Sequence, residues 1–272
     1  MLWLLLGMGI AGILTLIFHT FYVKTSQVKV EASCSPLTIV HLSDLHGRTR
    51  FLNGALHRLV NRFEPDLIVV TGDLAQHFGQ LERVLKELGR MKSKNGIFFV
   101  PGNYEHEQSV GLKKKKYSPE VYEASKIAWK EKMVILENAA FEIEKDKSCI
   151  QIYGFDNSVY GNERYQQMKL RSPVANLTIL LAHSPKIISF VKEHHIRANL
   201  LLTGHTHGGQ IRIFGRTFGA YKHFHIGQKA DETVDLFCIS RGLGTSRLPV
   251  RFCCFPEITI YHIRHEKNPC RS

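Results

Sequence analysis

The chain has 272 residues, of which 44% are hydrophobic and 22% charged, enough for one large or two small globular domains. This composition excludes a disordered chain, a collagen-like repeat and a small disulfide scaffold, and because the six cysteines show no CxxC spacing we expect reduced thiols. The formal charge of +12 favours contact with phosphates, whether of nucleic acid, an anionic membrane surface or a phosphorylated ligand.

The first 23 residues predict a retained membrane anchor. Residues 2–23 contain no Asp, Glu, Lys or Arg, and as a helix they would span about 33 Å. A secretory signal peptide fits less well, because no Lys or Arg precedes the apolar run and no small-x-small site closes it. Lys24 and Lys29 follow the run, so the positive-inside rule places the rest of the chain in the cytoplasm as a single-pass protein.

The remainder is expected to form one domain. We predict a juxtamembrane linker at 24–36, the domain at 37–265 and a tail at 266–272. Buried strands are predicted from the apolar runs at 37–42, 67–70, 97–100, 177–181 and 200–202. Amphipathic stretches around 53–63, 79–91 and 185–194 predict intervening helices, and 211–214, 234–239 and 258–263 predict further strands. This alternation indicates βαβ units and a sheet covered on both faces.

Each of the five buried strands ends in side chains that bind metal ions. They are Asp44, His46, Asp73, Asn103, His183, His205 and His207. In open α/β sheets, ligands bind beyond the carboxyl ends of the strands. A single such residue is commonly a helix cap or a hydrogen-bonded core group, but seven at five successive strand ends favour a shared site.

The mixture of donor atoms limits which metal ions fit the site. Carboxylate, amide oxygen and imidazole suit Mn, Fe or Zn better than Ca or Mg, and manganese is our first choice. Two ions offer eight ligand positions, so seven residues require one bridging ligand, most readily a carboxylate. Two divalent ions about 3.5–4 Å apart hold a phosphoryl group and lower the pKa of a shared water, which predicts a hydrolase of P–O bonds.

The sequence resembles the calcineurin-like metallophosphoesterases from about Leu37 to Ile263. The motifs that carry the resemblance are HLSDLH at 41–46, TGD at 71–73, PGN at 101–103, AHSP at 182–185 and GHTHGGQ at 204–210. It implies a four-layer α/β/β/α sandwich. It also implies that one metal is held by Asp44, His46, Asp73 and His207, and the other by Asp73, Asn103, His183 and His205.

Residues 208–212 and 240–258 further resemble a bacterial membrane-associated branch of this family. Some of its members are UDP-2,3-diacylglucosamine diphosphatases of lipid A synthesis, and others have no settled substrate. The leading hypothesis is therefore a membrane-anchored enzyme that releases UMP and a lipid monophosphate from this lipid-linked nucleotide. The alternatives are a phosphodiesterase or phosphatase acting on soluble nucleotides, and a non-catalytic binding module that keeps the metal site.

Candidate catalytic residues are Asn103, Tyr104, His106 and Arg48. The family usually has His directly after the Asn, where this chain has Tyr104. Tyr is a weak proton source because its unperturbed pKa is about 10, so His106 is the alternative acid. A weak acid at this position favours a substrate with a good leaving group, such as a nucleotide phosphate. It is equally consistent with the sequence that Tyr104 only packs or forms a hydrogen bond. Arg48 is expected to contact a phosphate or to be a solvated charge.

Four consecutive lysines, Lys113–Lys116, precede an amphipathic stretch at 117–129. Such a run is usually solvated and mobile. In a membrane-anchored chain it is also expected to contact anionic headgroups. No interleaving of aromatic and basic residues indicates a nucleic-acid-binding module.

Overall fold

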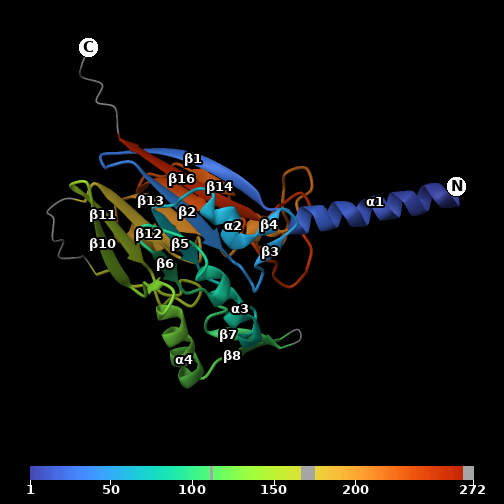
Figure 1. Ribbon diagram of the computed structural model, residues 1–272, viewed down its shortest axis with the longest axis horizontal. Helices are drawn as coiled ribbons and strands as arrows, with labels where there is room; N and C mark the ends of the chain where they lie inside the picture. The colour runs from blue at the N-terminus through green and yellow to red at the C-terminus, as the bar shows by residue number, and fades with distance from the viewer. Residues whose placement is uncertain (111–112, 167–174, 266–272) are drawn as a thin grey trace, which may run out of the picture.

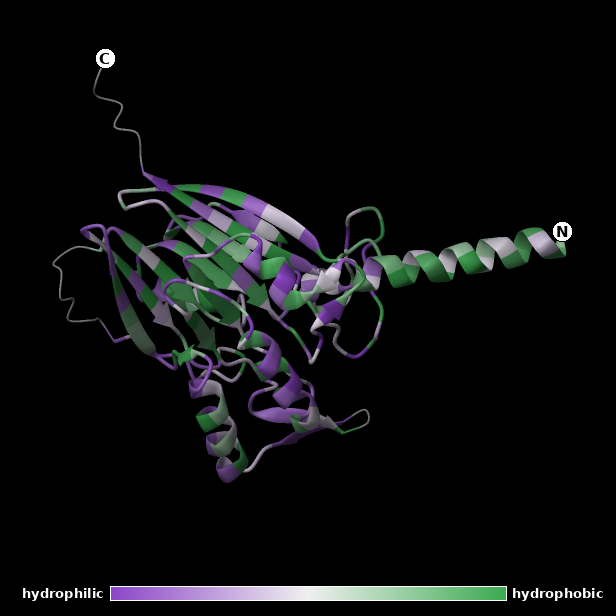
Figure 2. Ribbon diagram, in the orientation of Figure 1, coloured by the Kyte–Doolittle hydropathy of each residue, from purple (hydrophilic) through white to green (hydrophobic). Residues whose placement is uncertain are grey.

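The computed structural model describes residues 1–110, 113–166 and 175–265, so the tail expected at 266–272 lies outside the described residues. Helix α1 (Leu2–Phe21) projects from the body and is apolar along its length (Figures 1 and 2). It is long and apolar enough to cross a membrane, and only Thr20 among its residues is buried. The structure therefore contains the expected candidate span.

The first sheet has six strands in the order β1-β16-β2-β5-β6-β9. These strands are β1 (Lys24–Ala32), β2 (Leu37–Ser43), β5 (Leu67–Thr71), β6 (Ile97–Val100), β9 (Val134–Ile135) and β16 (Glu257–His265). Strand β1 pairs in parallel with β16 along its whole length, from Lys24 opposite Glu257 to Ala32 opposite His265. The linker expected at 24–36 is therefore wrong for residues 24–32, which form an edge strand of the domain.

The second sheet also has six strands, in the order β10-β11-β12-β13-β15-β14. They are β10 (Ala139–Lys145), β11 (Ser148–Gly154), β12 (Leu177–Leu181), β13 (Ala198–Thr203), β14 (Gly227–Lys229) and β15 (Val234–Ile239). Strands β11, β12, β13 and β15 run parallel, while the edge strands β10 and β14 are antiparallel to their neighbours. Both sheets are thus dominated by parallel central strands.

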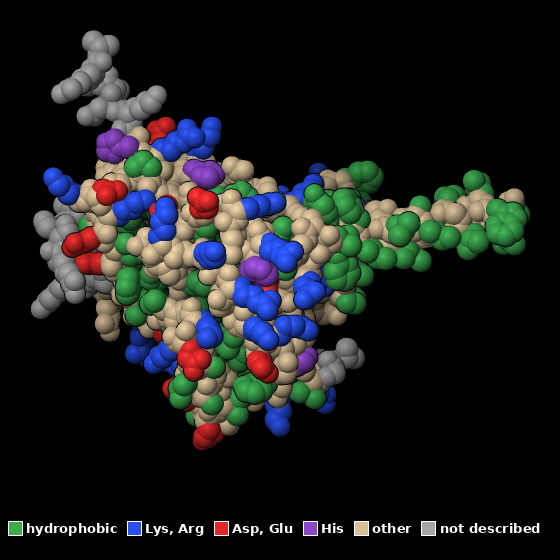
Figure 3. Space-filling view, viewed as in Figure 1, with side chains coloured by type: hydrophobic (Ala, Val, Ile, Leu, Met, Phe, Trp, Pro, Cys, Tyr) green, Lys and Arg blue, Asp and Glu red, His purple; other side chains and the backbone are tan. Residues whose placement is uncertain are grey.

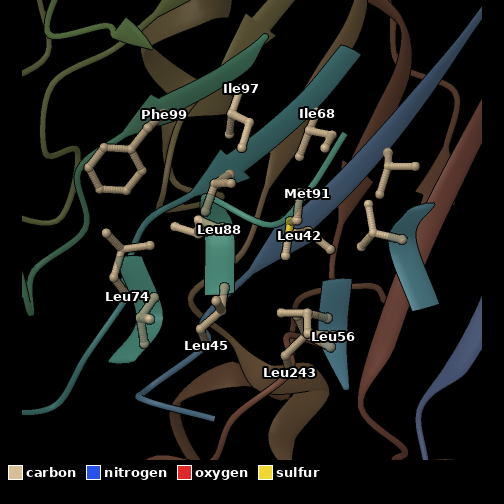
Figure 4. Close-up of a cluster of buried hydrophobic side chains, with 14 of the residues drawn as sticks. Leu42, Leu45, Leu56, Ile68, Leu74, Leu88, Met91, Ile97, Phe99 and Leu243 are labelled. Carbon is tan, nitrogen blue, oxygen red and sulfur yellow. The ribbon is translucent and has the colours of Figure 1, made fainter. Parts of the chain in front are cut away.

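The helices cover the outer faces of the two sheets. Helices α2 (Leu56–Asn61), α3 (Phe78–Leu88) and α4 (Pro119–Lys130) pack on the first sheet, and α5 (Ile187–Glu193) packs on the second. In β5, Ile68 and Val70 face the helices, and Figure 4 shows Ile68 among the buried side chains of this layer. Leu67 and Val69 face the other sheet, because successive side chains in a strand point to opposite faces. The expected four-layer α/β/β/α sandwich is confirmed.

Short elements decorate this sandwich. They are the hairpin of β3 (Arg50–Phe51) and β4 (Gly54–Ala55), the hairpin of β7 (Glu107–Val110) and β8 (Lys113–Lys116), and the 3₁₀ turns η1 (His207–Gly209) and η2 (Gly219–Tyr221). The lysine run is therefore a strand paired with β7. The strand expected at 211–214 is wrong: Ile211 and Ile213 form only isolated bridges in a glycine-containing loop.

Candidate metal centre

The seven predicted ligands converge because the carboxyl ends of the central strands in both sheets meet at one edge of the sandwich. Asp44 and His46 follow β2, Asp73 follows β5 and Asn103 follows β6. From the second sheet, His183 follows β12, and His205 and His207 follow β13. Asp44, Asp73, Asn103, His183 and His207 are almost completely buried.

Six of these residues form two groups of three. Within each group, one potential ligand atom from each residue lies within 4.8 Å of those of the other two. The first group is Asp44, His46 and His207, and the second is Asp73, His183 and His205. In the first, the Nε2 atoms of His46 and His207 are 3.0 Å apart. In the second, Nε2 of His183 is 3.0 Å from Nδ1 of His205. The two candidate clusters support a dinuclear divalent metal site.

The carboxylate of Asp73 lies between the two groups. Its Oδ2 is 3.5 Å from Nε2 of His46 and 3.3 Å from Nε2 of His183, one residue from each group. Its Oδ1 accepts a hydrogen bond from the backbone amide of Tyr104 at 2.9 Å. This arrangement fixes the carboxylate and directs Oδ2 toward both sets of imidazoles, as a bridging ligand requires.

Asn103 provides an independent test of whether a metal fits. Its Nδ2 donates to Oε1 of Glu107 at 2.9 Å, which fixes the orientation of the side-chain amide. Its Oδ1 is buried without a hydrogen-bond partner in the described structure. An unsatisfied buried oxygen is costly in a protein interior, and a divalent cation would satisfy it. The donor set of carboxylates, imidazoles and this amide oxygen therefore fits the expected ions.

The protonation states of the histidines also suit metal binding. Burial lowers the pKa of His46 to about 4 and that of His205 to about 3, which leaves both rings neutral at pH 7. Burial also disfavours the charged form of His183, but the Asp73 carboxylate outweighs it and raises the pKa of this ring to about 10. A bound cation would replace that proton, because imidazole ligates only when neutral. The His183 Nδ1 already bonds to the carbonyl of Thr71 at 2.9 Å, which leaves Nε2 for the metal.

The backbone at the site is strained. Asp44, His46, Asp73, His205 and His207 all have positive φ, between 45° and 68°. Non-glycine residues rarely adopt this region, and they cluster there at functional sites. A side chain at position 204 would overlap the hydroxyl of Ser43, so this glycine permits the close approach of the two sheets before His205.

The two candidate acids occupy different places. The Tyr104 ring packs edge-to-face against His46, with 4.8 Å between ring centroids, and its hydroxyl accepts from Ser109 at 3.3 Å. His106 instead stacks on Tyr122, with centroids 4.4 Å apart. The described ring contacts of His106 reach Tyr122 and Tyr160 and neither metal group. Tyr104 is thus the candidate that contacts a predicted ligand.

Arg48 contacts the end of the apolar helix. Its Nη1 donates to the carbonyl of Thr20 at 2.7 Å, and its guanidinium lies over the ring of Phe21 at 4.5 Å. The structure therefore gives Arg48 a role in holding α1, and its donors are partly occupied there. The expected phosphate contact of Arg48 stays a prediction.

Three buried residues that support the site escaped the sequence analysis. Glu105 accepts from the backbone amides of Asp73, Leu74 and Gly102 at 2.6–2.8 Å, which joins the loops after β5 and β6. Glu107 orients Asn103, as described above. The guanidinium of Arg251 donates to the carbonyls of His207 and Gly244. Glu105 follows the PGN motif and Arg251 lies within residues 240–258, but both contact residues far away in the sequence, so their roles could not be predicted from local patterns.

The chain is similar in sequence to known metallophosphoesterases. The sequence model described as Calcineurin-like phosphoesterase matches residues 37–209. The uncharacterized metallophosphoesterase YkuE of Bacillus subtilis is 28% identical over 89% of this chain and 86% of its own length. A "Transmembrane protein with metallophosphoesterase domain" of Bos taurus is 29% identical over 87% of this chain and 56% of its own. The solved NAD nucleotidase of Haemophilus influenzae aligns with a TM-score of 0.48 at 16% identity, covering 77% of this chain and 46% of that one.

Proposed function

Because the chain belongs to the calcineurin-like phosphoesterase family, we propose that it is a membrane-anchored hydrolase that cleaves a phosphoester or pyrophosphate bond in an amphipathic substrate. That it is a metal-dependent phosphoesterase follows from the family and the two ligand groups. The observation that carries the membrane part of the proposal is the attachment of α1 beside the metal loops. Arg251 contacts both Thr20 of α1 and His207 of the first group.

The residues of the chain define what the site does in the reaction. Two divalent ions held there would supply Lewis acidity and a water activated at neutral pH. Asp73 would keep the two ligand groups at a fixed separation, since its Oδ2 faces both. Asn103 would present its fixed Oδ1 to the second group. The Tyr104 hydroxyl could donate a hydrogen bond to a leaving group, which suits a leaving group that needs little protonation.

Exposed apolar side chains occur in the loops near the end of α1, since Leu52 bonds to Phe21 and the 211–218 loop pairs with Phe252, which contacts His19. We call this set the apolar collar: Leu52, Ile213, Phe214, Phe218 and Leu248. Phe214 is fully exposed and Phe218 is 69% exposed, which is unusual for such large apolar side chains on a water-soluble surface. Figure 3 shows hydrophobic side chains gathered at the base of α1. The collar supports contact between this end of the body and the bilayer.

The loop that carries Phe214 and Phe218 also reaches the metal site. Tyr221, a few residues on, has its hydroxyl 3.3 Å from Nε2 of His205. One loop would therefore extend from the membrane surface to the second ligand group. An acylated substrate could keep its chains in the bilayer while its phosphate enters the site.

Three finer parts of the proposal rest on the sequence. We propose manganese as the metal, with iron or zinc as alternatives, because the donors mix oxygen and nitrogen. We propose that the body lies in the cytoplasm, because Lys24 and Lys29 follow the apolar segment. The specific substrate we propose is UDP-2,3-diacylglucosamine, because residues 208–212 and 240–258 resemble the membrane-associated branch.

The test is a product assay with the full-length chain in detergent, after chelation and return of Mn²⁺. Substrates would be UDP-2,3-diacylglucosamine, a lipid diphosphate without a nucleotide, a soluble nucleotide and a small chromogenic diester, with products identified by mass. UMP and a lipid monophosphate are expected from the first substrate. Far faster turnover of soluble nucleotides than of either lipid would favour the soluble-nucleotide alternative. No turnover of any substrate with two metal ions bound would favour the binding module.

A further inference from the structure

Two adjoining cavities lie beside the metal centre between α3 and the β3–β4 hairpin. Their volumes are about 580 and 280 Å³, and they share Arg50, Glu87 and Arg90. We call them together the basic groove. The cations that line it are Arg48, Arg50, Arg58, Arg83, Lys86 and Arg90. Glu87 is the one acidic residue in the lining of both cavities.

The cations of the groove outnumber the acidic groups that pair with them. Glu87 lies 3.8 Å from Nη1 of Arg90, and it also accepts from the backbone amide of His57, whose Nδ1 is 2.8 Å from the carboxylate. Among the described residues, no carboxylate lies within ion-pair distance of Arg50, Arg83 or Lys86. A concave surface with this excess of cations attracts anions strongly, and guanidinium groups match the geometry of phosphate oxygens.

The Arg and Lys side chains of the groove lie on two opposite walls, each formed by a different segment of the chain. Arg83 and Lys86 are spaced at i and i+3, so they share one side of α3, while the leucines of that helix face the core. Arg90 follows directly after the helix C-cap Gly89 and lines the same cavities. Arg50 belongs to the opposite wall, at the start of the β3–β4 hairpin. Figure 3 shows Lys and Arg side chains concentrated on this face of the body.

The groove connects the metal centre with the membrane helix. His46 of the first ligand group lines the larger cavity, and Arg83 donates to the carbonyl of Gly47 at 2.6 Å. At the other end, the backbone amide of Leu52 donates to the carbonyl of Phe21 in α1 at 2.8 Å. The same hairpin thus directs Arg50 into the groove and places the exposed Leu52 next to the end of α1.

We propose that the basic groove binds the phosphorylated headgroup of an anionic membrane lipid. If α1 spans the bilayer, its end at Phe21 lies at the level of the lipid phosphates, and Arg48 and Leu52 hold the groove against that end. A lipid is favoured over nucleic acid because the apolar collar adjoins the cations. The inference rests on the membrane anchoring in the proposed function and is independent of the hydrolytic reaction.

Native mass spectrometry of the full-length chain in neutral detergent tests this without an activity assay. The probe is phosphatidylglycerol, with phosphatidylcholine as the uncharged comparison. Arg83→Gln/Lys86→Gln/Arg90→Gln should weaken phosphatidylglycerol retention at least about tenfold, since each cation near a membrane surface adds to the attraction. Arg50→Gln on the opposite wall should weaken it less, in the same direction.

The matched control is Lys130→Gln/Lys147→Gln/Lys229→Gln, which removes the same charge from exposed lysines outside the groove. It should keep the retention of the original chain. Equal losses in the two triple variants would overturn the inference in favour of general charge attraction. Inorganic pyrophosphate and a single-stranded oligonucleotide serve as further probes. The inference would also be overturned if the groove triple variant bound either of these less well but retained phosphatidylglycerol unchanged. Because lipid counting needs no turnover, an inactive enzyme would contradict the proposed function and leave this result interpretable.

Discussion

The backbone amide of Arg251 donates to the hydroxyl oxygen of Thr20 at 2.8 Å, which ties the last turn of α1 to the loop that supports the metal centre. Both residues are buried. The guanidinium of Arg251 in turn contacts the carbonyl of His207 at 3.3 Å and that of Gly244 at 2.6 Å. Helix α1 is therefore part of the packing that holds the predicted ligand His207.

This contact predicts a cost to stability when the hydroxyl of Thr20 is removed. Thr20→Val keeps the shape but leaves the buried Arg251 amide without its partner, which should reduce the free energy of unfolding by about 1–3 kcal/mol. Thr15→Val is the matched control, because the hydroxyls of Thr15 and Thr20 each donate to the carbonyl four residues earlier, but Thr15 is exposed. Guanidinium titration followed by the fluorescence of the buried Trp129 measures both. Equal effects would contradict the contact.

The sequence predicted the parts of the fold that are buried on both faces. Strands such as β5 and β12 are continuous apolar runs and stand out clearly. Strand β1 does not, because only Val28, Val30 and Ala32 are buried among polar residues, so its stretch resembles a linker. Its place is set by pairing with β16, more than 200 residues later, which no local pattern encodes.

The same distinction applies to the site. The ligands were predictable because each directly follows a strand, and strand ends meet at one edge. The contacts of Glu107, Arg251 and Tyr221 were not, since each reaches the site from a loop or hairpin. His106 shows that closeness in sequence does not fix position in the site: it is two residues from Tyr104, but its ring stacks on Tyr122. Its role as the alternative acid stays a prediction.

The central position of Asp73 predicts that its loss affects both metals. Asp73→Ala should retain neither ion, because Oδ2 faces both groups, whereas His207→Ala should keep the ion of the second group. Metal analysis after gel filtration provides the measurement. Two ions retained by Asp73→Ala would show that this carboxylate does not bridge.

Glu107 is predicted to act on the metals through Asn103. Its carboxylate accepts from Nδ2 of Asn103 and from the hydroxyl of Tyr160 at 2.6 Å. Glu107→Gln should weaken binding of the second ion about 10- to 100-fold, because the amide oxygen of Asn103 is no longer fixed. Titration of the apo protein with Mn²⁺ measures this, with the exposed Glu123→Gln as control. Unchanged affinity in Glu107→Gln would show that Asn103 needs no such support.

The lysines of β8 are predicted to differ because successive residues in a strand face opposite sides. Lys114 pairs with Glu107 and lies over the ring of Tyr104 at 4.7 Å. Lys114→Gln should reduce kcat/KM about tenfold for any phosphoester, since a cation beside the site is lost. Lys113→Gln/Lys115→Gln should instead affect only lipid-linked substrates. If the Lys114 variant and the Lys113/Lys115 variant lower kcat/KM for a small diester equally, the side of β8 on which a lysine lies does not affect catalysis.

His41 predicts a loss of stability in mild acid. It is completely buried, its Nε2 lies 2.8 Å from the hydroxyl of Thr71, and burial lowers its pKa to about 3. The unfolded chain takes up the proton near the ordinary pKa of about 6.5, so its contribution is fully present above that pH and is lost as the pH falls toward 3. Between pH 7 and pH 5 the loss of unfolding free energy amounts to about 2 kcal/mol, at about 1.4 kcal/mol per pH unit below 6.5.

Urea titrations at both pH values should therefore show a smaller difference in unfolding free energy in His41→Gln than in the original chain. His262→Gln, at a more exposed ring in β16, should leave the difference unchanged. The same pH dependence in His41→Gln as in the original chain would assign the acid sensitivity to other groups.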